Sequence, residues 1–159
     1  MGLFMHITLC CLGVLITNYF LGVKAETCST GWLKKQRTCY GYFNEELSWH
    51  EAETKCQSYN KGCHLASLLN NQESKLVAQY IKNKQNSGSS VWIGLSDENE
   101  KRQWQWADGS TFSYDKWNAG EPNNKYEEYC VELTSDTNFR KWNDLSCDRL
   151  NAYICKCQM

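Results

Sequence analysis

The chain has 159 residues and a formal net charge of −1, so it has no overall positive field that would attract nucleic acid or an anionic membrane surface. Its length suits one compact domain. Ten cysteines and seven tryptophans indicate a secreted domain that disulfides and large aromatic side chains hold together.

The N-terminal segment has the character of a signal peptide. Residues 7–23 are almost wholly apolar, and Val23 and Ala25 have the small-residue spacing of a signal-peptidase site. A membrane anchor is the alternative, but the stretch is short for a bilayer span, and Asn18 and Gly22 interrupt it. We therefore expect residues 1–25 to be a signal peptide and residues 26–159 to form a secreted domain that does not insert into a membrane.

Two helices are predicted after this segment. In residues 48–60, Ser48 and Glu51 have the spacing of a capping box, and apolar side chains recur every three or four residues. In residues 70–84, an asparagine cap, either Asn70 or Asn71, precedes a second apolar stripe.

Several short strands should follow the helices. Residues 91–95 form a continuous apolar run that predicts a buried central strand, and residues 103–109 alternate and end in Asp-Gly, which predicts a hairpin. Between about residues 109 and 128 the apolar residues show no periodicity, which predicts a long loop. A loop of this length in a compact domain is usually functional. The sequence therefore predicts an α+β fold with two helices, antiparallel sheets and one long loop. Further strands are expected at residues 129–133, 139–142 and 152–157.

The cysteines favour a disulfide framework. An even number in the mature chain of a secreted protein predicts four internal bridges, although spacing alone does not fix their pairing. A zinc site is the alternative, but there is no Cys-x-x-Cys pair, and the mature chain has only two histidines. The eight cysteines are Cys28, Cys39, Cys56, Cys63, Cys130, Cys147, Cys155 and Cys157.

The stretch AGEPNNKYEEYC, residues 119–130, contains the only proline of the chain, Pro122. Carboxylates and amides surround it, and their oxygens can bind a metal ion. The loop is therefore a candidate metal site, with a solvated turn as the alternative. The oxygen-bearing residues are Glu121, Asn123, Asn124, Glu127 and Glu128.

The chain resembles the C-type lectin-like domain. The resemblance is carried by WIGL (92–95), EPN (121–123), WND (142–144) and four framework cysteines, and it covers residues 28–157. Other stretches, such as residues 39–43 (CYGYF), look like snake-venom lectins and regenerating-type proteins. The resemblance implies the disulfides Cys28–Cys39, Cys56–Cys155 and Cys130–Cys147 and, as in venom lectins, Cys63–Cys157.

The resemblance also implies a Ca²⁺ ion beside a cis bond before Pro122. Its implied ligands, which would also bind the sugar, are Glu121, Asn123, Glu128, Asn143 and Asp144. Glu127 is the alternative to Glu128. A second calcium ion is a further alternative, near Asp97, Glu98, Glu100 and Asn124.

These features predict a secreted, calcium-dependent lectin. In the family, the order Glu121 then Asn123 suits equatorial vicinal hydroxyls, so we expect mannose-type glycans (mannose, fucose or N-acetylglucosamine) as partners. Tyr126 is expected to be exposed, where it could stack on a sugar. The alternative is a non-catalytic, protein-binding toxin of the same fold that acts on haemostasis or a receptor; the complete ligand set argues against it.

No enzymatic activity is expected, because no nucleophile elbow or metalloprotease helix is present and the carboxylates are better explained by calcium. With the eight cysteines paired internally, no thiol remains for a disulfide to a partner. We therefore expect a monomer or a non-covalent homo-oligomer.

Overall fold

The computed structural model describes residues 27–159, so the expected signal peptide, residues 1–25, lies outside the described residues. None of the helices in the described part of the chain has the length and apolar character needed to cross a bilayer. In chain order, the elements are β1 (Leu33–Lys35), β2 (Thr38–Leu47), α1 (Trp49–Tyr59), β3 (Cys63–Leu65), α2 (Asn71–Lys84), β4 (Val91–Ser96), β5 (Gln105–Trp106), β6 (Cys130–Leu133), the 3₁₀ helix η1 (Ser135–Thr137), β7 (Trp142–Leu145) and β8 (Asn151–Gln158).

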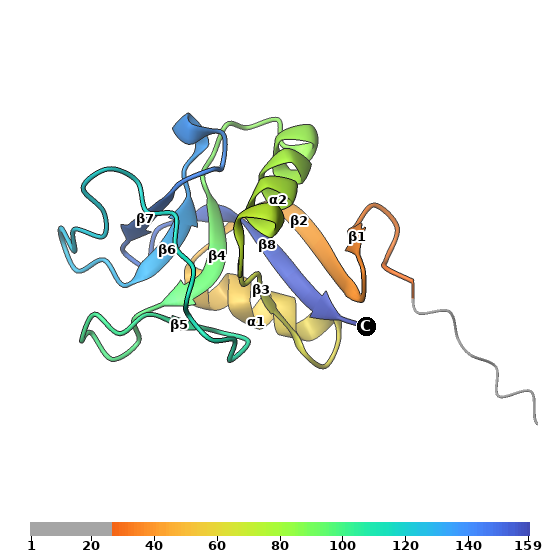
Figure 1. Ribbon diagram of the computed structural model, residues 1–159, viewed down its shortest axis with the longest axis horizontal. Coiled ribbons are helices and arrows are strands. Elements are labelled where there is room, and N and C mark those ends of the chain that lie inside the picture. The colour runs from red at the N-terminus through yellow and green to blue at the C-terminus, as the bar shows by residue number, and fades with distance from the viewer. Residues whose placement is uncertain (1–26) are drawn as a thin grey trace, which may run out of the picture.

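The strands form one hydrogen-bonded network in the order β1-β2-β8-β4-β6-β7, with β3 paired to β8 and β5 paired to β4 (Figure 1). The fold is α+β, as predicted. The sheet is antiparallel except for the pairing of β4 with β8, which is parallel. The central strand β4 is buried along its whole length, which agrees with its continuous apolar sequence.

The two helices cover opposite faces of the central strands. Successive side chains of a strand point to opposite faces. Accordingly, Ile93 of β4 and Ile154 of β8 pack in one cluster with Ile81 of α2, whereas Trp92 and Tyr153 pack in a second cluster with α1. The apolar stripes of both helices thus face the sheet.

Both predicted helix starts agree with the structure. The Ser48 side chain accepts a hydrogen bond from the backbone N–H of Glu51, and the Glu51 carboxylate accepts one from the N–H of Ser48. At the second helix, Asn70 is the cap, because its Oδ1 accepts a hydrogen bond of 2.9 Å from the N–H of Glu73.

Two strand predictions were wrong. Asp108 and Gly109 do not form a hairpin turn. The strand before them, β5, pairs with the earlier strand β4 and not with a strand that follows Gly109. The Asp108 carboxylate instead accepts hydrogen bonds from the Ser67 hydroxyl and the Ser110 N–H, which turn the chain into the long loop. The strand expected at residues 139–142 begins only at Trp142, because Phe139 has a left-handed backbone conformation (φ 61°) and belongs to a turn.

The longest strands, β2 and β8, pair antiparallel along most of their length. Residues of β2 were not predicted as a strand, because Gly41 and the polar residues Asn44, Glu45 and Glu46 interrupt the apolar pattern. In the fold, a Cβ at Gly41 would lie 2.5 Å from the indole of Trp32, so the glycine permits close packing of this ring on the strand.

Four disulfides are present, and their pairing is the one that the resemblance implies: Cys28–Cys39, Cys56–Cys155, Cys63–Cys157 and Cys130–Cys147. The bridge between α1 and β8 closes a sequence separation of 99 residues. In the chain-entropy picture, a loop of this size stabilises the fold by about 4–5 kcal/mol.

A buried ion pair lies under α2. Nζ of Lys156 on β8 lies 2.9 Å from Oε1 of Glu73, and both side chains are almost completely buried. The hydroxyl of Tyr40 also donates to this carboxylate, and Lys156 donates to the carbonyl oxygen of Ser67. The pair therefore joins α2 to the central sheet.

Candidate calcium site

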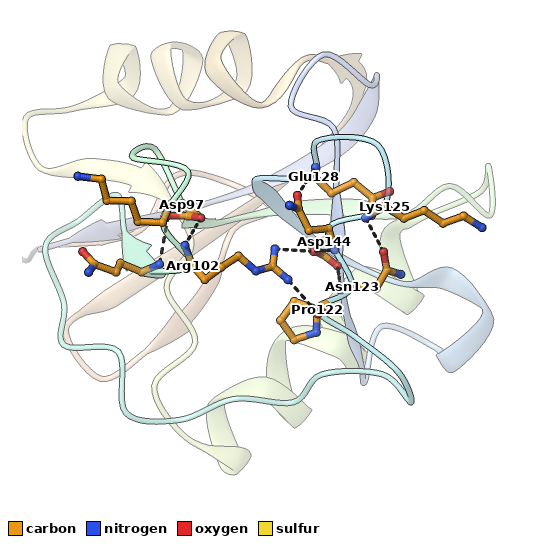
Figure 2. Close-up of polar contacts among 10 residues, drawn as sticks. Asp97, Arg102, Pro122, Asn123, Lys125, Glu128 and Asp144 are labelled. Carbon is orange, nitrogen blue, oxygen red and sulfur yellow. Dashed lines mark hydrogen bonds and ion pairs between the residues drawn. The ribbon is translucent and has the colours of Figure 1, made fainter.

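The long loop is attached to β7 at two places. Trp142, the first residue of β7, donates its N–H to the Lys116 carbonyl at 2.9 Å and accepts the N–H of Asn118 at 2.8 Å. Two residues further along β7, the fully buried carboxylate of Asp144 accepts the backbone N–H groups of Asn123 (3.0 Å, Oδ1) and Asn124 (2.8 Å, Oδ2). The EPN segment is thereby held directly against the WND segment (Figure 2).

Glu121 stands at the beginning of this segment. The Glu121–Pro122 peptide bond is cis, as the resemblance implies. One carboxylate oxygen of Glu121, Oε2, is buried and has no hydrogen-bond partner. Burial raises the pKa of Glu121 above its ordinary value, and the nearby carboxylates of Asp144 and Glu128 raise it further. A bound cation would stabilise the ionised forms of these neighbouring carboxylates.

Glu128 closes the other end of the loop. Its Oε2 accepts the N–H of Lys125 at 2.9 Å, and its own N–H donates to Oδ1 of Asn124 at 3.0 Å. Burial and the Asp144 carboxylate raise the pKa of Glu128. Glu127 is exposed whereas Glu128 is half-buried, which favours Glu128 as the residue that belongs to the site.

Asn143 precedes Asp144 on β7 and faces β6. Its Nδ2 donates to Oε1 of Glu132 at 3.2 Å, and the other oxygen of Glu132 accepts Nδ2 of Asn151 at 2.7 Å. Sequence reasoning missed Glu132. The only signal was a carboxylate inside a short apolar strand, CVEL. A carboxylate that is buried there needs hydrogen-bond donors around it.

Arg102 is a second residue that sequence reasoning missed. Its Nη1 lies 3.3 Å from Oδ2 of Asp144, and its Nη2 donates to the Pro122 carbonyl at 2.9 Å (Figure 2). The guanidinium also lies over the ring of Trp104, 5.7 Å from its centroid. Arg102 therefore links the candidate site to the preceding loop.

The loop that carries Arg102 is organised by Asp97. The buried carboxylate of Asp97 accepts the backbone N–H groups of Lys101 (3.2 Å), Arg102 (2.7 Å) and Gln103 (3.2 Å). These bonds occupy the carboxylate that a second calcium ion would need.

The donor set fits calcium, but only when the amides are included. Among residues 27–159, no group of three or more His, Cys, Asp or Glu side chains is arranged to hold a metal ion. The three carboxylates are thus not a ready-made acidic cluster. The oxygen-only character of the set and the unpartnered buried oxygen of Glu121 suit a hard cation such as Ca²⁺. The candidate ligands are Glu121, Asn123, Glu128, Asn143 and Asp144.

The chain is similar to known proteins over most of its length. Residues 45–157 match the family model described as the Lectin C-type domain. C-type lectin BfL-2 of Bungarus fasciatus is 42% identical over 159 residues, and a C-type lectin mannose-binding isoform of Notechis scutatus scutatus is 42% identical over 160 residues; each alignment covers 99% of both chains. The solved structure of human lithostathine superposes with a TM-score of 0.79 at 36% identity, covering 83% of this chain and 100% of that chain.

Proposed function

The chain belongs to the C-type lectin family, and from this premise we propose that it is a secreted, calcium-dependent lectin that binds mannose-type sugars. The family is not catalytic, which agrees with the prediction that the chain is not an enzyme. The observation that carries the proposal is the buried, unpartnered carboxylate oxygen of Glu121 beside Asp144 and Glu128.

Five residues would hold the ion: Glu121, Asn123, Glu128, Asn143 and Asp144. Their carboxylate and amide oxygens supply fewer ligands than calcium accepts, so positions are left for an exogenous ligand. When bound, the ion would supply a positive centre at which two sugar hydroxyl oxygens are accepted.

The same side chains would orient the sugar. Each carboxylate can accept a hydrogen bond from a sugar hydroxyl, and each amide can donate one. Hydrogen bonds to charged groups are the stronger kind. The order Glu121 then Asn123 supports selectivity for equatorial vicinal hydroxyls, and a relative named as a mannose-binding isoform supports the same choice.

Tyr126 provides a surface next to these residues. Its side chain is 81% exposed, the largest exposure among the described large hydrophobic side chains. The ammonium group of Lys125 lies 5.5 Å from the centre of the ring. We propose that Tyr126 contacts sugar residues beyond the one bound at the calcium ion.

The cysteines support the proposed secretion and limit the proposed modes of assembly. All eight cysteines of the described chain form internal disulfides, which suits an oxidising compartment. No thiol in residues 27–159 is left for a partner, so the proposed states are a monomer or a non-covalent homo-oligomer. A single shallow site is weak, so agglutination would require several sites in one assembly.

The test is a glycan array probed in millimolar calcium and again with chelator. The expected result is binding to mannose-type glycans that disappears with chelator. The matched variant Glu121→Gln/Asn123→Asp exchanges the donor and acceptor order and should shift preference towards galactose. Binding that ignores chelator, or a wild-type preference for galactose, would contradict the proposal. Binding to a clotting factor or receptor without glycan dependence would favour the toxin alternative.

A further inference from the structure

Glu132 is a buried carboxylate directly beside the candidate ligand Asn143. We propose that Glu132 is a positioning residue that fixes the side-chain amide of Asn143: one N–H of the amide donates to Glu132, and the amide oxygen faces the calcium ion. The inference rests on the proposed function, because it concerns the same ion.

The two residues are opposite each other in the sheet. Glu132 of β6 and Asn143 of β7 form a register pair between antiparallel strands, and such neighbours are close enough for their side chains to touch. The Glu132 side chain is only 8% exposed, so water does not compete freely for its oxygens. Oε1 accepts Nδ2 of Asn143 at 3.2 Å.

Asn151 holds the other side of the carboxylate. Its Nδ2 donates to Oε2 of Glu132 at 2.7 Å, and Asn151 is itself 8% exposed at the start of β8. The polar chain Asn151–Glu132–Asn143 therefore connects β8, β6 and β7. With both oxygens engaged, Glu132 has little freedom to rotate.

The direction of these bonds decides which end of the Asn143 amide faces the ion. Both oxygens of the Glu132 carboxylate accept hydrogen bonds from amide NH₂ groups, so Glu132 selects the NH₂ group of the Asn143 amide. The amide oxygen then points away from Glu132. If the amide were reversed, two oxygens would face each other inside the protein, and an NH₂ group would face the cation. Groups that orient ligands in this way affect metal affinity strongly.

A reciprocal exchange of donor and acceptor tests the proposal. Glu132→Gln should weaken calcium binding, measured by titration calorimetry, by about tenfold or more. Asn143→Asp should also weaken it, because a carboxylate would then face Glu132. The double variant Glu132→Gln/Asn143→Asp restores one donor, one acceptor and the net charge, so its calcium affinity should recover to within a few-fold of wild type.

The control is Glu53→Gln. Glu53 is also a buried carboxylate, but it lies on α1 and accepts hydrogen bonds from the Leu65 N–H and from His64. This variant should lower the melting temperature and leave calcium affinity unchanged. Wild-type affinity in the Glu132→Gln variant, or no recovery in the double variant, would overturn the inference. If wild-type protein binds no calcium, the proposed function itself fails.

A second measurement uses the wild-type protein and does not depend on whether the variants fold. The side-chain amide signals of Asn143 can be assigned in a ¹⁵N spectrum. In calcium-free protein, one Nδ2 proton should be shifted downfield and protected from exchange with water. Two protons that exchange at solvent rates before calcium is added would also overturn the inference.

Discussion

Arg102 and Asp144 are joined across 42 residues of sequence by an ion pair of 3.3 Å between Nη1 and Oδ2. The same guanidinium donates to the carbonyl of Pro122. A cation that belongs to the chain thus already contacts the loop that is proposed to bind calcium.

We expect Arg102→Gln to loosen this loop in calcium-free protein. The Arg102 side chain is 38% exposed, and ion pairs screened by water are worth about 0.2–1 kcal/mol. Local opening should therefore become about 1.4- to fivefold more frequent. Trypsin should cleave after the exposed Lys125 faster in chelator by this factor, as measured by mass spectrometry of the reduced chain, and calcium should restore protection.

The matched control is Lys101→Gln. Lys101 is an exposed, positively charged neighbour in the same loop, so its loss should leave the cleavage rate after Lys125 unchanged. Equal cleavage of wild type and Arg102→Gln in chelator would show that the Arg102 contact does not order the loop.

Asp144→Asn tests the buried carboxylate at the centre of the site. The amide can accept only one of the hydrogen bonds from Asn123 and Asn124, and an unsatisfied buried N–H costs about 1–3 kcal/mol. The melting temperature in chelator should fall by several degrees, and calcium should no longer raise it. Calorimetry with and without calcium provides the measurement.

Asp136→Asn is the control for that variant, because Asp136 is exposed on η1. It should behave as wild type in both conditions. Retention of calcium-induced stabilisation in Asp144→Asn would exclude Asp144 as a ligand.

On acidification, calcium affinity should begin to fall at a higher pH than it would if the glutamate ligands had ordinary pKa values. Burial and neighbouring carboxylates raise the pKa of Glu121 and of Glu128 in the calcium-free protein. Protons should therefore compete with calcium at pH values above the usual pKa of glutamate. Calorimetric titrations at successive pH values should show proton release on calcium binding in this window. Affinity that stays constant until the usual glutamate range would contradict the raised pKa values.

The buried pair under α2 predicts a separate pH effect on stability. Burial raises the pKa of Glu73, but hydrogen bonds from Tyr40, the Leu69 N–H and Lys156 outweigh this effect, so the pKa is lowered overall. A lowered pKa means that the stabilisation is complete above the unfolded-state value and is lost as the pH falls from there through the folded-state value. The free energy of unfolding of Glu73→Gln should vary less with pH in that interval.

At neutral pH, Glu73→Gln should destabilise the fold by about 3–5 kcal/mol, because it leaves the buried ammonium group of Lys156 without its counter-charge. The double variant Glu73→Gln/Lys156→Met should be less destabilised than the single variant. Denaturant unfolding at several pH values measures both effects. Additive losses in the double variant would mean that the two charges do not interact.

The parts of the fold that were predicted correctly have local or covalent causes. The capping box of Ser48 and Glu51 depends on residues three positions apart, and the apolar run at residues 91–95 shows the burial of β4 directly. The pairing of the disulfides and the cis bond before Pro122 came from resemblance rather than from spacing.

The parts that were missed depend on contacts between distant segments. Arg102 reaches Asp144 only because Asp97 binds the loop backbone and Arg102 adopts a positive φ of 60°. Glu132 meets Asn143 only through the register of β6 and β7. Neither relationship has a sequence signature, because each requires the relative position of two elements that the sequence does not specify locally.

The cross-links of β8 have a consequence for how damage to this lectin would be detected. Scission of the peptide after Lys125 would place Glu121 and Asn123 on one fragment and Glu128, Asn143 and Asp144 on the other. Cys56–Cys155 and Cys63–Cys157 would keep the fragments covalently attached. Without reductant, the nicked molecule would therefore migrate in a gel as a single species of nearly unchanged mass, even though the residues of the proposed sugar site were divided between two fragments.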